Sequence, residues 1–146
     1  MTPNWLGCEK WINDWFLGIQ KGYAIGDPKK KFILLAVALR ETNQVIGQIN
    51  IGRKYDEYLH GELSISYFIS EKYINNGFAT EAVKAITSYA FDKYGYDFVM
   101  AVVKSKNLAS ARVLEKSGFK YITDTEISEQ NVMILFHYYR LYNALN

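Results

Sequence analysis

The chain has 146 residues, enough for one domain with a hydrophobic core, and its two prolines and mixed composition argue against a disordered polypeptide. A net charge of +2 gives no electrostatic case for nucleic acid, and the single cysteine, Cys8, excludes an intrachain disulfide. Without a recognisable signal peptide or an apolar run long enough to span a membrane, a cytoplasmic location is the default expectation.

An amphipathic helix and a β-hairpin are expected in the first third of the chain. Apolar residues recur at helical spacing and predict the helix over residues 6–21. Two apolar runs, 31–40 and 45–51, flank a polar turn and predict the hairpin. In the second run, strict alternation predicts that one face carries Val45, Gly47, Ile49 and Ile51.

The strand predicted over residues 62–70 has the clearest alternation of apolar and polar residues in the chain. One face is apolar and is expected to be buried; it carries Leu63, Ile65, Tyr67 and Ile69. The other face is expected to lie against solvent or a cleft, and it carries Glu62, Ser64, Ser66 and Phe68.

The turn Asn75-Asn76-Gly77 leads from this strand into a helix that is expected to end near Gly95. A helix that begins on such a turn presents several backbone N–H groups, and this arrangement binds anions, phosphates above all. The turn lacks both the Gly-Lys-Ser/Thr ending of a P-loop and the Gly-x-Gly-x-x-Gly pattern of a dinucleotide-binding fold. A plain turn explains the same three residues about equally well.

The rest of the chain completes an α+β pattern. Residues 96–103 are apolar on both faces and predict a central strand. A short helix is expected between Asn107 as N-cap and Gly118 as the C′ residue. Two further apolar runs predict a closing hairpin. This order of elements predicts one α+β domain over residues 1–146, with a mostly antiparallel sheet.

Two stretches carry a family resemblance: NNGFATEA, residues 75–82, and NLASARVLEKSGF, residues 107–119. Together they resemble the GNAT N-acetyltransferases, and most closely the branch of ribosomal-protein N-terminal acetyltransferases. The resemblance covers residues 1 to 142 and is most specific between Glu62 and Phe119. It implies the acyl-CoA N-acyltransferase fold, with helices on both faces of a mixed sheet. It also implies an enzyme that transfers acetyl from acetyl-CoA to a primary amine, on a protein N-terminus or a small molecule.

The resemblance further implies which residues bind acetyl-CoA. The strand ending at Phe68 and Ile69 would pair with the pantetheine amides, and Asn107 would bond the pantetheine arm. Ser110 would either bond the cofactor or help to cap its helix, and a plain N-cap role stays open for Asn107. Backbone N–H groups of the turn would surround the pyrophosphate, which assigns this site to Asn75, Asn76, Gly77, Phe78, Ala79 and Thr80.

Acetyl transfer needs a neutral amine, so a general base is expected. Glu62 is the expected base, with a plain surface carboxylate as the alternative, and Ser64 would orient water or substrate together with Ser66. Backbone N–H groups near Phe68 and Ile69 would polarise the thioester carbonyl. No metal is expected, because the two histidines of the chain are not spaced as zinc ligands.

Several positions depart from the family pattern. Ile74 stands where many members have Gln or Arg, and Leu114 where many have a tyrosine general acid. Ser64 stands where the branch often has a glutamate, and Glu62 lies two residues earlier on the same strand face. The usual first strand and helix, roughly 30 residues, are expected to be absent, which would expose a sheet edge and favour a homodimer.

Two other functions remain open. The chain could be a non-catalytic acyl-CoA-binding or regulatory module that has kept the turn and lost the chemistry. It could also be a generic phosphate- or nucleotide-binding domain. No nucleic-acid or membrane partner is expected. The acceptor is not readable from the sequence, and a protein N-terminus, a polyamine, an antibiotic or a small metabolite all fit.

Overall fold

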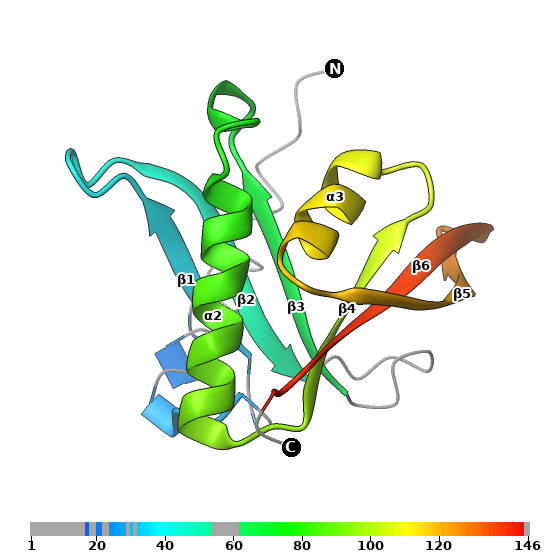
Figure 1. Ribbon diagram of the computed structural model, residues 1–146, viewed down its shortest axis with the longest axis horizontal. Coiled ribbons are helices and arrows are strands. Elements are labelled where there is room, and N and C mark those ends of the chain that lie inside the picture. Colours follow the sequence, from blue (N-terminus) through cyan, green and yellow to red (C-terminus); the bar gives the residue numbers. More distant parts are fainter. Residues whose placement is uncertain are drawn as a thin grey trace.

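The computed structural model describes residues 17, 20–21, 24–28, 30, 32–53 and 62–144. The helix expected over residues 6–21 falls mostly outside these ranges; its described residues, Leu17, Gln20 and Lys21, are helical. Within the described ranges, one sheet carries two α-helices on one of its faces (Figure 1). The α+β class expected from the sequence is confirmed.

Six strands form the sheet in the order β1-β2-β3-β4-β6-β5. Neighbouring strands are antiparallel except β3 and β4, which run parallel. The sheet is therefore mixed and mostly antiparallel, as expected. The strands are β1 (Ile33–Ala38), β2 (Val45–Arg53), β3 (Leu63–Ile69), β4 (Phe98–Lys104), β5 (Lys120–Glu129) and β6 (Val132–Tyr142).

The helices follow the two parallel strands. α2 (Phe78–Tyr94) leads from β3 to β4, and α3 (Leu108–Lys116) leads from β4 to β5. A short 3₁₀ helix, η2 (Glu71–Tyr73), precedes the turn before α2. α2 ends at Gly95, whose φ of 61° suits a residue without a side chain, as the sequence predicted.

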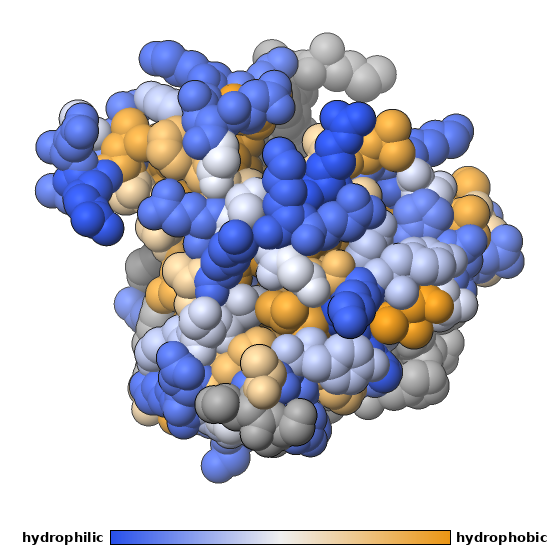
Figure 2. All heavy atoms as spheres, in the orientation of Figure 1, coloured by the Kyte–Doolittle hydropathy of each residue, from blue (hydrophilic) through white to orange (hydrophobic). Residues whose placement is uncertain are grey.

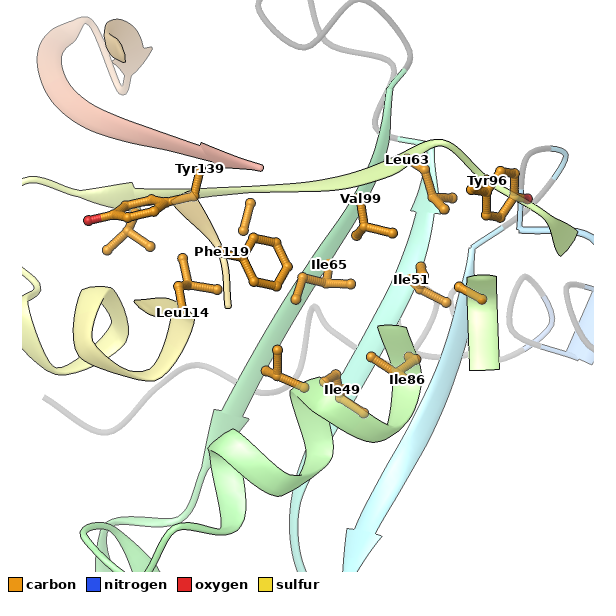
Figure 3. Close-up of a cluster of buried hydrophobic side chains, with 14 of the residues drawn as sticks. Ile49, Ile51, Leu63, Ile65, Ile86, Tyr96, Val99, Leu114, Phe119 and Tyr139 are labelled. Atoms are coloured by element: carbon orange, nitrogen blue, oxygen red, sulfur yellow. The ribbon is translucent and has the colours of Figure 1, made fainter. Parts of the chain in front are cut away.

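The main core lies between the sheet and both helices (Figure 3). Alternate residues of β2 and β3, among them Ile49 and Ile65, point into it, and the fully buried Leu114 enters it from α3. Because α2 and α3 share this core, they lie on the same face of the sheet. The predicted apolar face of β3 is confirmed. The outer surface of this layer is mostly hydrophilic, with small hydrophobic patches between (Figure 2).

The alternation predicted for β2 is wrong at the start of that strand. Val45 is 63% exposed, whereas Ile46 is 2% exposed. The cause is a β-bulge: Val37 pairs with Gly47 and Ala38 pairs with Val45, so Ile46 is the extra residue. A bulge shifts the inward and outward alternation by one residue, and sequence periodicity carries no signal for it.

A second, smaller apolar cluster lies on the other face of the sheet. Met100 is fully buried there, Tyr138 is 8% exposed, and Val102 packs against them. Val102 of β4 pairs directly with Tyr138 of β6. β4 is therefore buried on both faces, which confirms its predicted central position.

β3 and β4 separate soon after they meet. The two strands pair at a single register position, Ser64 with Met100. Beyond it, β3 stays paired with β2 as far as Ile69, and β4 stays paired with β6 as far as Lys104. Figure 1 shows the two strands diverging toward their C-terminal ends. We call this divergence the β3–β4 splay; ligands of sheets with parallel strands commonly bind at such C-terminal ends.

Candidate active site

Two helix N-termini lie at the open end of the splay. β3 leads through η2 and the turn at residues 75–77 into α2, and β4 leads through residues 105–107 into α3. The first N–H groups of a helix have no acceptor within the helix, and this end of the helix carries partial positive charge. The splay therefore opens toward two electropositive helix ends, an arrangement suited to an anionic ligand.

Gly77 is the N-cap of α2, with a φ of 82°. No side chain caps this helix, and the first bond within it is donated by Glu81 N–H to the Gly77 carbonyl at 3.0 Å. The N–H groups of Phe78, Ala79 and Thr80 thus lack an acceptor within the helix. A Cβ added at Gly77 would meet no atom within 4 Å. The turn therefore has both the free donors and the open space that an anion site needs.

The two asparagines before Gly77 shape the turn. Asn75 has a φ of 62°. Asn76 donates its side-chain amide to the carbonyls of Tyr73 and Ile74, at 3.2 and 2.9 Å. The Asn76 side chain is thus occupied in holding the turn. Ile74 is 50% exposed and carries no charge, so an anion bound at this turn would depend on backbone N–H groups.

Asn107 caps α3. Its Oδ1 accepts a hydrogen bond from the Ser110 N–H at 3.1 Å, which confirms the N-cap role that the sequence left open. The cap uses the side-chain oxygen, so the side-chain NH₂ of Asn107 is the group left for a ligand. The backbone of Ser110 is fully occupied, because its carbonyl accepts a hydrogen bond from the Tyr67 hydroxyl.

The backbone of β3 faces the splay at Tyr67 and Ile69. Ser70 N–H donates to the Ile46 carbonyl on β2 at 2.7 Å. Peptide directions alternate along a strand, so the N–H and C=O of Phe68 point toward β2, and those of Tyr67 and Ile69 point away from it. Phe68 and Ile69 were the two residues expected to pair with a ligand through their backbone, and of these Ile69 presents its backbone to the splay. Phe68 does not, and its side chain is 55% exposed on the second face of the sheet.

The Tyr67 side chain joins β3 to α3. Its hydroxyl donates to the Ser110 carbonyl at 3.2 Å, and its ring packs against the main core. Burial raises the pKa of Tyr67, against a smaller opposing effect of the bond to Ser110. The phenol is therefore protonated, and a hydrogen-bond donor, at neutral pH.

Glu62 belongs to a hydrogen-bonded cluster with Tyr138 and Arg140. Arg140 donates its Nη2–H to Oε1 of Glu62 at 2.7 Å, and the Tyr138 hydroxyl donates to Oε2. Arg140 also donates its Nε–H to the Tyr138 oxygen at 2.6 Å, and its guanidinium lies 4.3 Å from the centre of the Phe98 ring. Both Glu62 oxygens are held by side chains of β6, so this carboxylate is paired, and the choice between a general base and a structural carboxylate stays untested.

The hydroxyls of the two serines of β3 donate hydrogen bonds to groups on β2. Ser64 donates its hydroxyl to the Gly52 carbonyl at 3.2 Å, and Ser66 donates to Oδ1 of Asn50 at 2.8 Å. With Gln48 and neighbours from β1 and β4, they line a hollow of about 290 Å³. It lies on the same face of the sheet as Glu62, away from α2 and α3. A larger hollow lies between β1 and α2, and Tyr67, Ile69 and Asn107 are not among the residues that line it.

The neighbours His137 and Tyr138 on β6 point to opposite faces of the sheet. Tyr138 joins Glu62, whereas Nδ1 of His137 lies 2.6 Å from Oδ1 of Asp124 and its ring packs edge-on against Tyr121. Within the described ranges, no three His, Cys, Asp or Glu side chains are grouped to hold a metal ion. No helix in that part of the chain is long and apolar enough to cross a membrane.

Sequence reasoning missed two of these residues. Arg140 stands inside an apolar strand, and a charge at such a position needs a partner, so a paired site on β6 could have been inferred. Tyr67 was assigned to the apolar face of its strand, which is correct. Its reach to α3 depends on the splay, and no sequence pattern reports the splay.

The fold and this site define an acyltransferase-like protein, and comparison with known proteins identifies the class. Residues 2–120 match the family model described as an acetyltransferase (GNAT) domain. The chain belongs to the GNAT acetyltransferase family, which confirms the resemblance at the level of the family, while the ribosomal-protein branch stays a prediction.

Individual relatives include curated bacterial proteins. The chain is 34% identical to the uncharacterized N-acetyltransferase YoaA of Bacillus subtilis over 92 residues. This aligned region covers 63% of this chain and 51% of YoaA. It is 42% identical over 55 residues to the probable N-acetyltransferase YjcK of the same organism, covering 38% of this chain and 30% of YjcK. The chain thus spans about half the length, or less, of these relatives.

Solved structures share the fold. A GNAT-family acetyltransferase from Bacillus anthracis is 26% identical, with a TM-score of 0.67 over 75% of this chain and 65% of that one. A ribosomal-protein-S5-alanine acetyltransferase from Vibrio fischeri is 16% identical, with a TM-score of 0.73 over 88% of this chain and 68% of that one. At that identity the second likeness shows the fold alone.

Proposed function

We propose that this chain is an acetyl-CoA-dependent N-acetyltransferase acting on a primary amine. The observation that carries the proposal is the splay, where β3 and β4 pair at one position and then open toward two helix N-termini. Acetyl-CoA has a pyrophosphate, which suits a helix N-terminus, and a chain of amides, which suits the open side of a strand. When bound, it supplies an acetyl group activated as a thioester.

The residues that would hold acetyl-CoA fit these two needs. The N–H groups of residues 75–80 would bind the pyrophosphate, around the open space at Gly77. The backbone of Tyr67 and Ile69, which faces away from β2, would pair with the pantetheine amides. The side-chain NH₂ of Asn107 would donate to the same arm, while Ser110 stays in the cap. Phe68 is not part of this set, because its peptide faces β2.

Glu62 is the proposed base. Held by Arg140 and Tyr138 on the second face, its carboxylate would take a proton from the amine directly or through a water. Of the two β3 N–H groups that point into the splay, those of Tyr67 and Ile69, one would polarise the thioester carbonyl and the other would pair with a pantetheine amide. The acceptor would enter by the 290 Å³ hollow, where Ser64 and Ser66 could orient it.

A protein N-terminus is the first acceptor to test. Two neighbours in fold are described as ribosomal-protein acetyltransferases, one of them a protein that acts on an alanine of a ribosomal protein. Both are under 20% identical to this chain, so this supports the ribosomal-protein branch through fold alone. We further propose a cytoplasmic protein and a homodimer, since β1 forms an edge of the described sheet.

A non-catalytic acyl-CoA-binding module is the second candidate. It is favoured by Leu114, which is fully buried and apolar where the family resemblance leads one to expect a tyrosine. It is also favoured by Glu62, because an ion pair holds this carboxylate away from free solvent.

Two measurements separate these functions. Calorimetry with acetyl-CoA, against ATP as a control for generic nucleotide binding, tests the cofactor site. Release of free CoA is then followed with a panel of amines: peptides with N-terminal serine or alanine, a polyamine and an aminoglycoside. Tight acetyl-CoA binding with CoA release for one amine supports the enzyme. Binding without release for any amine supports the module, and preference for ATP would contradict both.

A further inference from the structure

Glu62 and Arg140 form an ion pair that spans the second face of the sheet. Glu62 precedes β3, Arg140 lies on β6, and β4 lies between these two strands, so the bond of 2.7 Å between the side chains crosses β4. Glu62 is 23% exposed and Arg140 28% exposed, so a ligand can reach both from solvent. Half-buried pairs of this kind add little net stability, because desolvation of the two charges offsets their attraction.

Both charged groups keep capacity for a further partner. A guanidinium has five N–H donors, and the bonds from Arg140 to Glu62 and to Tyr138 use two of them. An ionised carboxylate has about four acceptor positions, and the bonds from Arg140 and Tyr138 occupy two of those on Glu62. A ligand can therefore bind to either group while the pair stays intact.

Aromatic rings hold the Arg140 guanidinium in place. It lies 4.3 Å from the centre of the Phe98 ring and 5.2 Å from the centre of the Tyr138 ring. A planar guanidinium that is fixed in this way is suited to a carboxylate, which it binds through parallel N–H···O bonds. Glu62 correspondingly attracts an ammonium group. The pair thus presents an anion site and a cation site side by side.

An α-amino acid matches this pair, because its ammonium and its carboxylate are attached to one carbon atom. A polyamine or an aminoglycoside carries several positive charges and no carboxylate. A protein N-terminus carries the ammonium alone, because its first carbonyl belongs to a peptide bond. Among the acceptors that the sequence left open, a small zwitterionic amine is therefore the one whose charges are complementary to Glu62 and Arg140.

The neighbouring hollow offers uncharged surroundings for the rest of such a molecule. It begins at Ser64, the next residue after Glu62 on the same strand face, and its volume of about 290 Å³ suits a small group. Arg53 is the only charged residue that lines it in the described part of the chain. Alternation along β2 places the Arg53 side chain on the other face of the sheet, with the buried Ile49 and Ile51.

We propose that the acceptor is a free α-amino acid with an uncharged side chain. This inference rests on the proposed function and names its amine. The ammonium lies against Glu62, which takes its proton, the carboxylate accepts hydrogen bonds from Arg140, and the side chain enters the hollow. Acetylation turns the amine into a neutral amide, so the product is no longer attracted to Glu62 and can leave.

The first test compares acceptors that differ in the carboxylate alone. The standard amino acids are screened with acetyl-CoA by release of free CoA, and the best one is compared with its α-amide and with its decarboxylated amine. An uncharged amino acid should give the highest kcat/KM. The amide and the decarboxylated amine should be roughly 10–100-fold poorer, the scale of a lost hydrogen bond to a charged group. Calorimetry on the protein with bound CoA should rank the three ligands in the same order without any transfer.

Arg140→Gln separates recognition from structure. It should raise KM for the amino acid roughly 10–100-fold, with little change in kcat, and should change KM for the amide much less. A purely structural role would affect both acceptors alike. If Arg140→Gln does not fold, Arg140→Lys keeps the charge without the planar fork and should raise KM for the amino acid by a smaller factor.

Lys104→Gln is the matched control. Lys104 also pairs with a glutamate, Glu129 at 2.5 Å, and also lies over an aromatic ring, 5.9 Å from the centre of Phe136. It stands at the far end of β4 from the Glu62 cluster. This variant should leave KM unchanged for both the amino acid and its amide.

The results that would overturn the inference are distinguishable from failure of the proposed function. If acetyl-CoA binds but a peptide, a polyamine or the α-amide reacts as well as any amino acid, the proposed function stands and the inference fails. Equal rises in KM for both acceptors in Arg140→Gln, or a preference for a charged amino acid, would also contradict it. If acetyl-CoA does not bind at all, the proposed function fails and the inference fails with it.

Discussion

Glu62 shows how a single side chain acquires a defined position. Alone, a carboxylate just before a strand is mobile and solvated. Here one oxygen accepts from Arg140 and the other from Tyr138, and both partners come from β6, across β4 in the sheet order. Removing one partner of such a half-buried pair leaves the other charge uncompensated. The cluster therefore couples any catalytic role of Glu62 to the stability of the sheet.

The first prediction separates those two roles. Glu62→Gln should lower turnover by roughly 10²–10⁴-fold if Glu62 is the base, with little change in acetyl-CoA affinity. The defect should shrink as pH rises, because more of the amine is then neutral. Arg140→Gln is the control, since it breaks the same ion pair and keeps the carboxylate. Equal losses in both variants, or more than about a third of the rate left in Glu62→Gln, would show that Glu62 is not the base.

Tyr138 gives a pH prediction. Burial, together with its bond to Glu62, raises the pKa of Tyr138 to about 12 from 10.0. A group whose pKa is raised by folding stabilises the protein fully below its unfolded pKa and loses that contribution as pH rises through the folded pKa. Wild type should therefore lose unfolding free energy, relative to Tyr138→Phe, between about pH 10 and 12. Urea denaturation at several pH values measures this, and parallel curves for the two proteins would contradict it.

At the scale of elements, α2 has glycines with positive φ at both of its ends. Gly77 has a φ of 82° at the N-cap and Gly95 a φ of 61° at the C-cap, and a Cβ at either would meet no atom within 4 Å. The two positions impose similar backbone strain and have similar open space. They differ in charge, because the N-terminus of a helix attracts anions and the C-terminus repels them. Only Gly77 lies on the side of the splay.

This symmetry gives a controlled test of the cofactor site. Gly77→Val and Gly95→Val should each cost about 1–3 kcal/mol of stability, the scale of strain at a left-handed position. Only Gly77→Val should weaken acetyl-CoA binding, by roughly 1–3 kcal/mol in calorimetry, because its side chain enters the space before the helix. Unchanged affinity in a folded Gly77→Val protein, or equal loss in Gly95→Val, would remove the turn from the site.

The N-terminus of α3 allows a similar separation of structure from binding. Asn107→Asp keeps an oxygen to accept the Ser110 N–H and removes the side-chain NH₂, so the cap should persist. We expect unfolding free energy within about 0.5 kcal/mol of wild type for Asn107→Asp and a loss of about 1 kcal/mol for Asn107→Ala. Acetyl-CoA affinity should fall in both. If Asn107→Asp binds as wild type does, Asn107 is a cap and nothing more.

At the scale of the whole molecule, the site exists because a mostly antiparallel sheet contains one parallel pair. Antiparallel neighbours on the outer sides of β3 and β4 hold each strand in place, so the two can diverge after Ser64 and Met100 without unfolding. The shared core of α2 and α3 covers one face of the splay. The other face carries the Glu62 cluster and the polar hollow. In the proposed reaction the donor would therefore enter at the open end of the splay, and the acceptor would approach from the face that α2 and α3 leave uncovered.

Most of the fold was predictable from the sequence, because its elements follow local rules. Period-two alternation indicated β3, an apolar run on both faces indicated the central β4, and Asn107 and Gly118 marked the ends of α3. The turn before α2 and the helix start at Gly77 were likewise predictable, whereas the role of this turn as an anion site stays a prediction. The β-bulge at Ile46 was not predictable, because register depends on how two strands meet and not on either sequence.

The sequence by itself determined the class of protein, the helix N-termini and the polar face of β3, since these depend on residues close together in the chain. Tertiary structure alone decided which peptides of β3 face the splay, that Tyr67 reaches α3, and that Glu62 is held by Tyr138 and Arg140. Those contacts join residues 43, 76 and 78 positions apart. Side-chain identity says that a carboxylate or a phenol needs a partner, but only the packed sheet brings one particular partner within hydrogen-bonding distance.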